Sequence, residues 1–336
     1  MMQKKEKKRL AILDILANNQ VPLSSTRITN TLNAQGLDIN ERTVRLYLSD
    51  FDEKGFTKNL GRKGRIITAA GIGETGAARV LERVGFLSGK IDTMAYRMDF
   101  DPTTRQGTVV VNISLVPVKE FTVYRRKLIA KVFSKGYAMG RMMAIFGPGE
   151  TCFGNIVPDG HVGLGTVCSI TFNGILQRRG IPVTSRFGGL LEIRNGKPRR
   201  FVELITYDGT SIDPLEIFIR AGMADYIGAI SNGNGRIGAS FREFPGESIS
   251  IIRTVATRLS EIGLGSLLCL GNPGENIFDF PVAPDRAGAV MIGGLNPISI
   301  FEETGLRIRS SALAGILPYD KLFSFTELDE RLEAFL

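Results

Sequence analysis

The sequence predicts a multidomain protein of the α+β or α/β class. It has an N-terminal winged helix-turn-helix, followed by an internally duplicated α/β effector domain with two pseudo-twofold units. Three observations predict this: a length of 336 residues, positive charge concentrated near the N-terminus, and short motifs that recur at a constant offset. We expect the winged helix-turn-helix at 1–70, a linker helix at 71–86, and effector units at 87–215 and 216–336.

Composition excludes several classes of protein. No run of about 18 apolar residues is present, so neither a membrane-spanning helix nor a membrane partner is expected. The first residues also lack the apolar stretch of a signal peptide, and the 3 cysteines do not suggest a disulfide framework. Together these features favour a cytoplasmic protein. With a single histidine and no C-x-x-C spacing, we expect no metal, no cofactor and no enzymatic activity.

Charge separates the N-terminal region from the rest of the chain. Residues 1–70 contain thirteen Lys and Arg against seven Asp and Glu, so +6 of the formal +8 lies there. A basic module on a nearly neutral body is typical of a protein in which one module contacts phosphate.

The N-terminal module has the pattern of a helix-turn-helix. Apolar spacing predicts a helix over roughly 5–18, and Ser24 or Ser25 can cap a second helix over 26–35. Asn40 is a good cap for a third helix over 41–51. Two short strand candidates in 56–68 flank a glycine-bounded basic turn, which predicts a wing.

The third helix is expected to enter the DNA major groove with its N-terminal end. Its apolar residues are spaced to face the core, which leaves the arginines near its start on the opposite face. We therefore expect DNA contacts from Thr26, Arg27, Arg42, Thr43, Arg45, Arg62, Lys63 and Arg65. A three-helix bundle with a solvated charged face, or a winged helix that binds protein, is the alternative.

The remainder of the chain contains a duplication. Pro148-Gly149-Glu150 recurs as Pro273-Gly274-Glu275, an offset of 125, and Gly180 recurs as Gly305 at the same offset. Each unit is predicted to contain a strand, a helix, a strand, the P-G-E turn, a strand and a short helix. The long helices are expected over 121–135 and 248–262. Paired units create a cleft where a ligand can bind, although a purely structural duplication fits equally well.

The junction from Gly163 to Thr171 is the best ligand-binding candidate. Its small residues allow close approach to the backbone, and the helix start presents amides and hydroxyls to an anion. Arginines downstream and in the second unit can bind a carboxylate. The expected ligand residues are Gly165, Thr166, Cys168, Ser169, Thr171, Arg186 and Arg242. An ordinary strand-to-helix connection, with Cys168 as a small core residue, is the alternative.

Several stretches together resemble the NrpR family of nitrogen-regulatory repressors. They are Gly165–Thr171, Ser185–Leu190, Ile237–Glu243 and Gly293–Pro297, in a chain that has the same order of winged helix and duplicated domain. The resemblance implies a homodimeric repressor of nitrogen-fixation and nitrogen-assimilation genes on an inverted-repeat operator in double-stranded DNA. It also implies that 2-oxoglutarate weakens DNA binding, and that a second repressor protein sometimes takes part.

Two other functions remain open at the level of sequence. One is an enzyme that acts on a small acid and carries an accessory winged helix. The other is a regulator that binds a protein partner without contacting DNA. The first needs a convergent set of acid and base residues, which the single histidine and scattered carboxylates do not supply.

Overall fold

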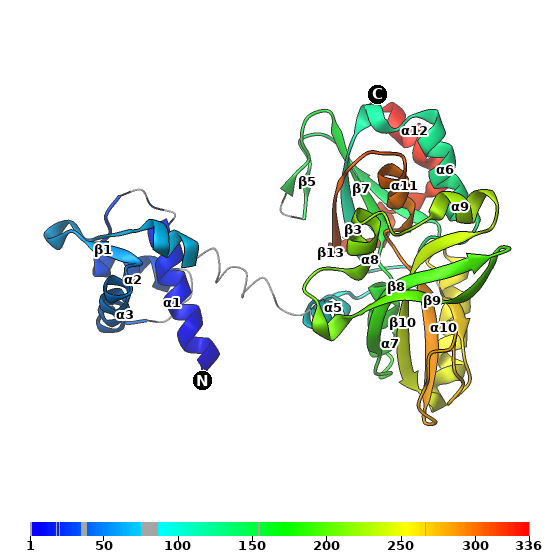
Figure 1. Ribbon diagram of the computed structural model, residues 1–336, viewed down its shortest axis with the longest axis horizontal. Helices are drawn as coiled ribbons and strands as arrows, with labels where there is room; N and C mark the ends of the chain where they lie inside the picture. The colour runs from blue at the N-terminus through cyan, green and yellow to red at the C-terminus, as the bar shows by residue number, and fades with distance from the viewer. Residues whose placement is uncertain are drawn as a thin grey trace. The chain divides into compact units, whose positions relative to one another are not determined.

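The computed structural model describes residues 2–17, 19, 21–34, 39–74, 87–153, 155–265 and 267–335. The chain divides into a small unit, Met1–Gly85, and a large unit, Phe86–Leu336 (Figure 1). The predicted linker helix at 71–86 lies outside the described residues except for 71–74, which are helical. No helix in the described part of the chain is long and apolar enough to cross a membrane.

The small unit is a winged helix. It contains α1 (Met2–Ala17), α2 (Ser25–Ala34), α3 (Glu41–Glu53), β1 (Thr57–Asn59), the 3-10 turn η1 (Gly61–Lys63) and β2 (Arg65–Ile67). The two strands pair antiparallel, and Leu23 forms a bridge with Arg65 at the edge of this hairpin. Buried apolar residues from all three helices form a separate core. The predicted helix-turn-helix and wing are therefore confirmed.

The helix α3 begins and packs as its sequence predicts. The Asn40 side chain accepts hydrogen bonds from Thr43 N and Thr43 Oγ1, both at 2.8 Å, which satisfies an amide that has no partner inside the helix. Val44, Leu48 and Phe51 are buried at spacings of three and four residues. This apolar stripe fixes which face of α3 remains exposed.

Two five-stranded antiparallel sheets form the large unit, which places the protein in the α+β class. The first sheet has the order β13 (Arg309–Pro318), β3 (Thr108–Pro117), β7 (His161–Val167), β4 (Met142–Phe146) and β14 (Phe323–Ser324). The second has the order β11 (Leu267–Leu270), β12 (Arg286–Ile292), β10 (Gly235–Pro245), β8 (Thr184–Arg194) and β9 (Lys197–Thr206). β5 (Thr151–Cys152) and β6 (Asn155–Ile156) form a separate hairpin.

Helices and short 3-10 turns join and cover these sheets (Figure 1). The helices are α5 (Leu87–Arg97), α6 (Val123–Ser134), α7 (Ile170–Gln177), α8 (Pro214–Arg220), α9 (Tyr226–Ser231), α10 (Ile249–Glu261), α11 (Ser299–Glu303) and α12 (Leu328–Glu333). The 3-10 turns are η2 (Val118–Glu120), η3 (Tyr207–Gly209), η4 (Gly246–Ser248), η5 (Asn296–Ile298), η6 (Tyr319–Lys321) and η7 (Phe325–Glu327).

The element order confirms the predicted duplication. The first repeat runs β3, α6, β4, β7, α7, and the second runs β10, α10, β11, β12, α11. The two P-G-E turns also share a contact: Glu150 accepts from Gly147 N at 3.0 Å, and Glu275 accepts from Asn272 N at 2.7 Å. Equivalent carboxylates thus stabilise equivalent turns.

The two repeats exchange a strand. β8 follows the first repeat in sequence but pairs with β10 of the second, and β13 follows the second but pairs with β3 of the first. The first strand of each repeat, β3 or β10, therefore hydrogen-bonds to a strand contributed by the other repeat. Each sheet contains strands from both sides of residue 215. The predicted units 87–215 and 216–336 therefore describe the sequence repeat, and as domain boundaries they stay a prediction.

Buried polar contacts also join the two repeats. Asn296 donates from Nδ2 to Tyr137 O at 2.8 Å and to Gly238 O at 2.9 Å, and it accepts from the Tyr226 hydroxyl at 2.6 Å. Buried apolar residues of both sheets belong to one continuous core. The repeats thus form one compact body with an internal boundary between them.

Candidate functional site

The outward face of α3 is basic at its start. Arg42 and Arg45 are exposed, Thr43 is half-buried, and Leu46 is 66% exposed beside them. Such a face, on the last helix of a helix-turn-helix, is the one that meets base edges in the major groove. Most of the predicted recognition residues are therefore accessible.

The two arginines of this face differ in their partners. Arg45 is held by Glu41, with 2.6 Å between its Nη2 and the carboxylate, and its Nε also donates to Ser25 Oγ at 3.2 Å. Hydrogen bonds from Ser25 and Arg45 hold the pKa of Glu41 below its ordinary value. In contrast, Arg42 has no ion pair within the described residues. Arg42 is thus the readier of the two to contact DNA.

The wing and α2 supply the other predicted DNA contacts. Arg62 and Lys63 are exposed in η1, without an ion pair in the ranges that the structure describes. Arg65 is half-buried and its Nε lies 2.7 Å from Asp52, so it ties the wing to the end of α3. On α2, Thr26 and Arg27 are exposed, and the Thr26 hydroxyl donates to Glu41 at 3.1 Å.

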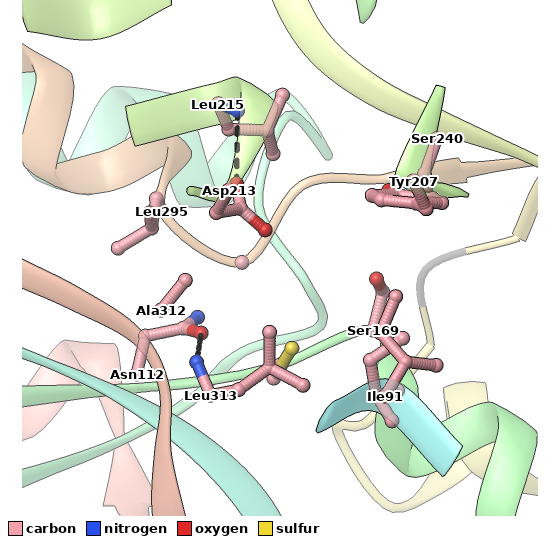
Figure 2. Close-up of a pocket in the computed structure, with 13 residues that line it drawn as sticks. Ile91, Asn112, Ser169, Tyr207, Asp213, Leu215, Ser240, Leu295, Ala312 and Leu313 are labelled. Atoms are coloured by element: carbon pink, nitrogen blue, oxygen red, sulfur yellow. Dashed lines mark hydrogen bonds between the residues drawn. The ribbon is translucent and has the colours of Figure 1, made fainter. Parts of the chain in front are cut away.

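The large unit contains a small cavity at the boundary between its repeats, which we call the central cavity (Figure 2). Its lining residues are Ile91, Asn112, Cys168, Ser169, Ile170, Tyr207, Asp213, Leu215, Ser240, Gly294, Leu295, Ala312 and Leu313. The volume is about 20 Å³, enough for roughly one water molecule. A metabolite therefore enters only if the lining elements move apart.

Equivalent positions of the two repeats face this cavity. Asn112 and Ser240 each lie five residues before the proline that ends their strand, β3 and β10. Ser169 and Gly294 each lie two residues after the equivalent strands β7 and β12. The cavity therefore lies between equivalent elements of the two repeats.

Arg242 is the largest fully buried side chain near the cavity. Its Nη2 donates to Ser169 Oγ at 2.7 Å, whereas its Nε and Nη1 have no hydrogen-bond partner among the described residues. Burial lowers the pKa of this guanidinium, while the neighbouring Tyr207 and Cys168 favour its charged form. A buried cation with two unpartnered donor nitrogens is an unusual feature that an anionic ligand would satisfy.

The structure brings together only some of the predicted ligand residues. Cys168 and Ser169 line the cavity, with Arg242 directly behind Ser169. Burial raises the pKa of the Cys168 thiol to about 12, which favours its neutral form. Ser169 is therefore the predicted hydroxyl that links the cavity to the buried guanidinium.

The other predicted ligand residues lie outside the lining. Gly165 packs against Ala144 between two strands, and Thr166 accepts from the Asn112 amide at 3.4 Å. The Thr171 hydroxyl exchanges hydrogen bonds with the backbone of Val110. The Arg186 side chain is 49% exposed and lies 3.7 Å from Glu243. Among these residues, Thr166 forms a side-chain hydrogen bond with a lining residue, Asn112.

Sequence reasoning missed four polar residues of the lining: Asn112, Tyr207, Asp213 and Ser240. Ser240 belongs to the stretch around Arg242, and its side chain interacts with that of Tyr207 on the cavity wall. Asn112 is the counterpart of Ser240 in the first repeat. Asp213 precedes Pro214 and caps α8 by accepting from Leu215 N at 2.8 Å, so its sequence signal is that of a helix cap.

No three His, Cys, Asp or Glu side chains gather as metal ligands would in the part of the chain that the structure describes. The candidate sites are thus an exposed basic surface in the small unit and a cavity beside a buried arginine in the large one.

Comparisons with known proteins agree with this division. Residues 84–324 match the family model of the NrpR regulatory domains NRD1 and 2, and residues 10–75 match that of the ribonuclease R winged-helix domain. A crystal structure of a nitrogen repressor-like protein from Methanococcus jannaschii superposes with a TM-score of 0.60 at 24% identity. It covers 71% of this chain and 98% of that chain, which supports the fold.

Two curated relatives match almost the whole chain. The global nitrogen regulator NrpRI of Methanosarcina mazei is 35% identical over 94% of this chain and 97% of its own length. The global nitrogen regulator NrpR of Methanococcus maripaludis is 31% identical over 97% of this chain, which spans 55% of that relative. On these matches, the chain belongs to the NrpR family of global nitrogen regulators, which are transcription regulators and not enzymes.

Proposed function

We propose that this protein is a homodimeric transcriptional repressor that binds an inverted-repeat operator and is released by a small anionic effector, 2-oxoglutarate. Its regulated genes would be those of nitrogen fixation and assimilation. The observation that carries DNA binding is the exposed Arg42 at the start of the last helix of a winged helix-turn-helix, together with Arg62 and Lys63 in the wing.

The exposed residues divide into two roles. Arg42, Thr43 and Arg45 would read base edges, because they lie on the outward face at the start of α3. Arg62 and Lys63 would contact phosphates from the wing, where a long flexible cation can follow the backbone. Arg65 would act mainly by holding the wing against Asp52.

The donors beside the central cavity are the observation that favours an anionic effector. Two nitrogens of Arg242, Nε and Nη1, have no hydrogen-bond partner among the described residues, and a carboxylate or keto oxygen can accept from each of them. In low dielectric such charge-assisted hydrogen bonds are strong, and they repay the cost of burying the guanidinium. A keto-dicarboxylate has the acceptors that this end of the cavity needs.

The helix α5 connects the cavity to the linker in sequence. Ile91 of α5 lines the cavity, Lys90 donates to Ala312 O at 3.1 Å, and Leu87 N donates to Thr210 O at 2.8 Å. Since a ligand larger than water must widen the cavity, its binding would shift α5, which directly follows residues 75–86. We infer that the effector signal leaves the large unit through this helix.

The test is fluorescence anisotropy with genomic DNA fragments, followed by selection of the bound sequences, with and without 2-oxoglutarate. We expect an inverted repeat that millimolar 2-oxoglutarate releases and that succinate and glutamate do not. A dimer with about 6–10 phosphate contacts should lose about 10³–10⁵ in affinity between 50 and 200 mM salt. A salt-insensitive complex contradicts the proposed DNA contacts.

The controls separate the parts of the proposal. If the protein binds DNA selectively but no acid tested changes its affinity, the proposed repressor role stands and the proposed effector is rejected. Selection only after a second repressor protein is added would assign part of the DNA contact to that partner.

A further inference from the structure

Asp213 gives the central cavity an acidic end. Its carboxyl group caps α8 through Leu215 N at 2.8 Å, and the residue lines the same cavity as Ser169 and Tyr207. Figure 2 shows Asp213 on one side of this space and Ser169 with Tyr207 on the other. Arg242 does not line the cavity but lies directly behind Ser169, so a buried cation stands next to the side of the cavity that faces Asp213.

Charged and titratable groups face Asp213 from each element packed around it. They are Lys90 of α5, Cys168 before α7, Tyr207 of η3 and Glu216 of α8, with Arg242 of β10 beyond Tyr207. Burial, and then the charge of Glu216, raise the pKa of Asp213 to about 6, and the backbone amides of Leu215 and Glu216, followed by the charge of Lys90, offset only part of this rise. This carboxyl group therefore accepts a proton more readily than an ordinary aspartate.

A ligand with two carboxylates creates a conflict at the acidic end. If one carboxylate takes the N–H groups of Arg242, the other points toward Asp213, and two ionised carboxylates cannot lie side by side in a small cavity. A proton shared between them removes the repulsion and makes Asp213 a hydrogen-bond donor. We propose that Asp213 takes up one proton when a dicarboxylate fills the central cavity, and that it thereby selects dicarboxylates and makes effector binding depend on pH. This inference rests on the proposed effector function.

Isothermal titration calorimetry of the full chain with 2-oxoglutarate tests the proposal. Titrations at pH 7 in two buffers of different ionisation enthalpy should show uptake of about one proton per ligand bound. The affinity should fall about tenfold from pH 7 to pH 8, since only the protonated form binds. With 2-oxovalerate, which carries a methyl group in place of the second carboxylate, we expect no proton uptake.

Matched variants locate the proton. Asp213→Asn keeps a helix-capping side chain and mimics the protonated acid, so its affinity for 2-oxoglutarate should be constant between pH 7 and pH 8. Asp208→Asn removes an exposed carboxylate from the neighbouring η3 and should keep the wild-type pH dependence.

Three results would overturn the inference. They are binding of 2-oxoglutarate without proton uptake, equal proton uptake with 2-oxovalerate, and a pH dependence abolished by Glu216→Gln but kept in Asp213→Asn. If Asp213→Asn does not fold, the wild-type titrations with the two ligands still decide. If 2-oxoglutarate does not bind at any pH between 6 and 8, both the proposed effector and this inference are rejected. If it binds without proton uptake, only this inference is rejected.

Discussion

The winged helix and the large unit use arginine in opposite ways. In the small unit, Arg42 and Arg62 lie exposed on a domain with its own small core. In the large unit, Arg242 is fully buried between two repeats, with one hydrogen bond and two unpartnered nitrogens, Nε and Nη1, among the described residues. The guanidinium group is thus solvated in the small unit and buried in a low-dielectric interior in the large unit.

This difference teaches which ligand each region can bind. Exposed cations attract a polyanion over a distance, but salt screens them, and each contributes modestly. A buried guanidinium costs free energy in the empty state and recovers it only when a specific anion reaches it. In the proposed function, the small unit accordingly binds DNA and the large unit binds one small acid.

The largest effect is expected from Arg242→Met. Wild-type DNA binding should weaken by about 5- to 150-fold with the effector, and this response should disappear in the variant, because the buried cation is gone. DNA affinity without the effector should stay at the wild-type value. Anisotropy titrations with and without 2-oxoglutarate measure both.

Stability provides an independent readout for the same variant. Replacing a poorly paired buried cation with an apolar side chain of similar volume should leave the free energy of unfolding unchanged or raise it by about 1–4 kcal/mol. Arg186→Met, at an exposed site, is the control and should keep the response. A response that survives in Arg242→Met would contradict the assignment of the cavity.

Arg42→Ala should have the next largest effect, and only on DNA. Loss of a base-reading arginine should cost about 1–3 kcal/mol on the operator and little on unrelated DNA. Lys54→Ala, at the end of α3 and paired with Asp50, is the matched control. If operator and unrelated DNA weaken equally, Arg42 contacts phosphate instead of a base.

A smaller and less selective effect is expected from Lys63→Ala in the wing. Without this cation, each subunit should neutralise one phosphate fewer, so binding to all sequences should weaken alike. The slope of log affinity against log salt should become shallower by about 0.9 for each phosphate that is no longer neutralised. Affinities at several salt concentrations measure this slope. An unchanged slope would place Lys63 away from the DNA.

The smallest effect on DNA is expected from Arg65→Ala, because its guanidinium is engaged by Asp52 at 2.7 Å. The variant should lose about 1 kcal/mol of small-unit stability, as for a partly buried ion pair, and should keep the wild-type salt slope. Thermal unfolding together with the salt titration distinguishes this role from a phosphate contact. A reduced slope with unchanged stability would show that Arg65 contacts a DNA phosphate.

Local patterns in the sequence were enough to predict the winged helix and the duplication. The third helix follows from the cap at Asn40 and the spacing of its apolar residues, which act within one or two turns. The repeats follow from motifs such as the P-G-E turns, whose carboxylates close the turn three residues away. Such short-range determinants can be recognised along the chain.

The strand exchange and the composition of the cavity were decided only by tertiary packing. β13 pairs with β3 about two hundred residues away, and hydrophobic alternation alone does not choose a partner for a strand. The cavity likewise joins Asn112, Asp213 and Ser240, each of which has an ordinary local role in a strand or helix cap. Arginine was expected near the ligand from its chemistry. That Arg242 is buried with two nitrogens unpartnered among the described residues, whereas Arg65 is already paired, depends on which side chains the fold brings within hydrogen-bond distance, and the sequence does not encode that locally.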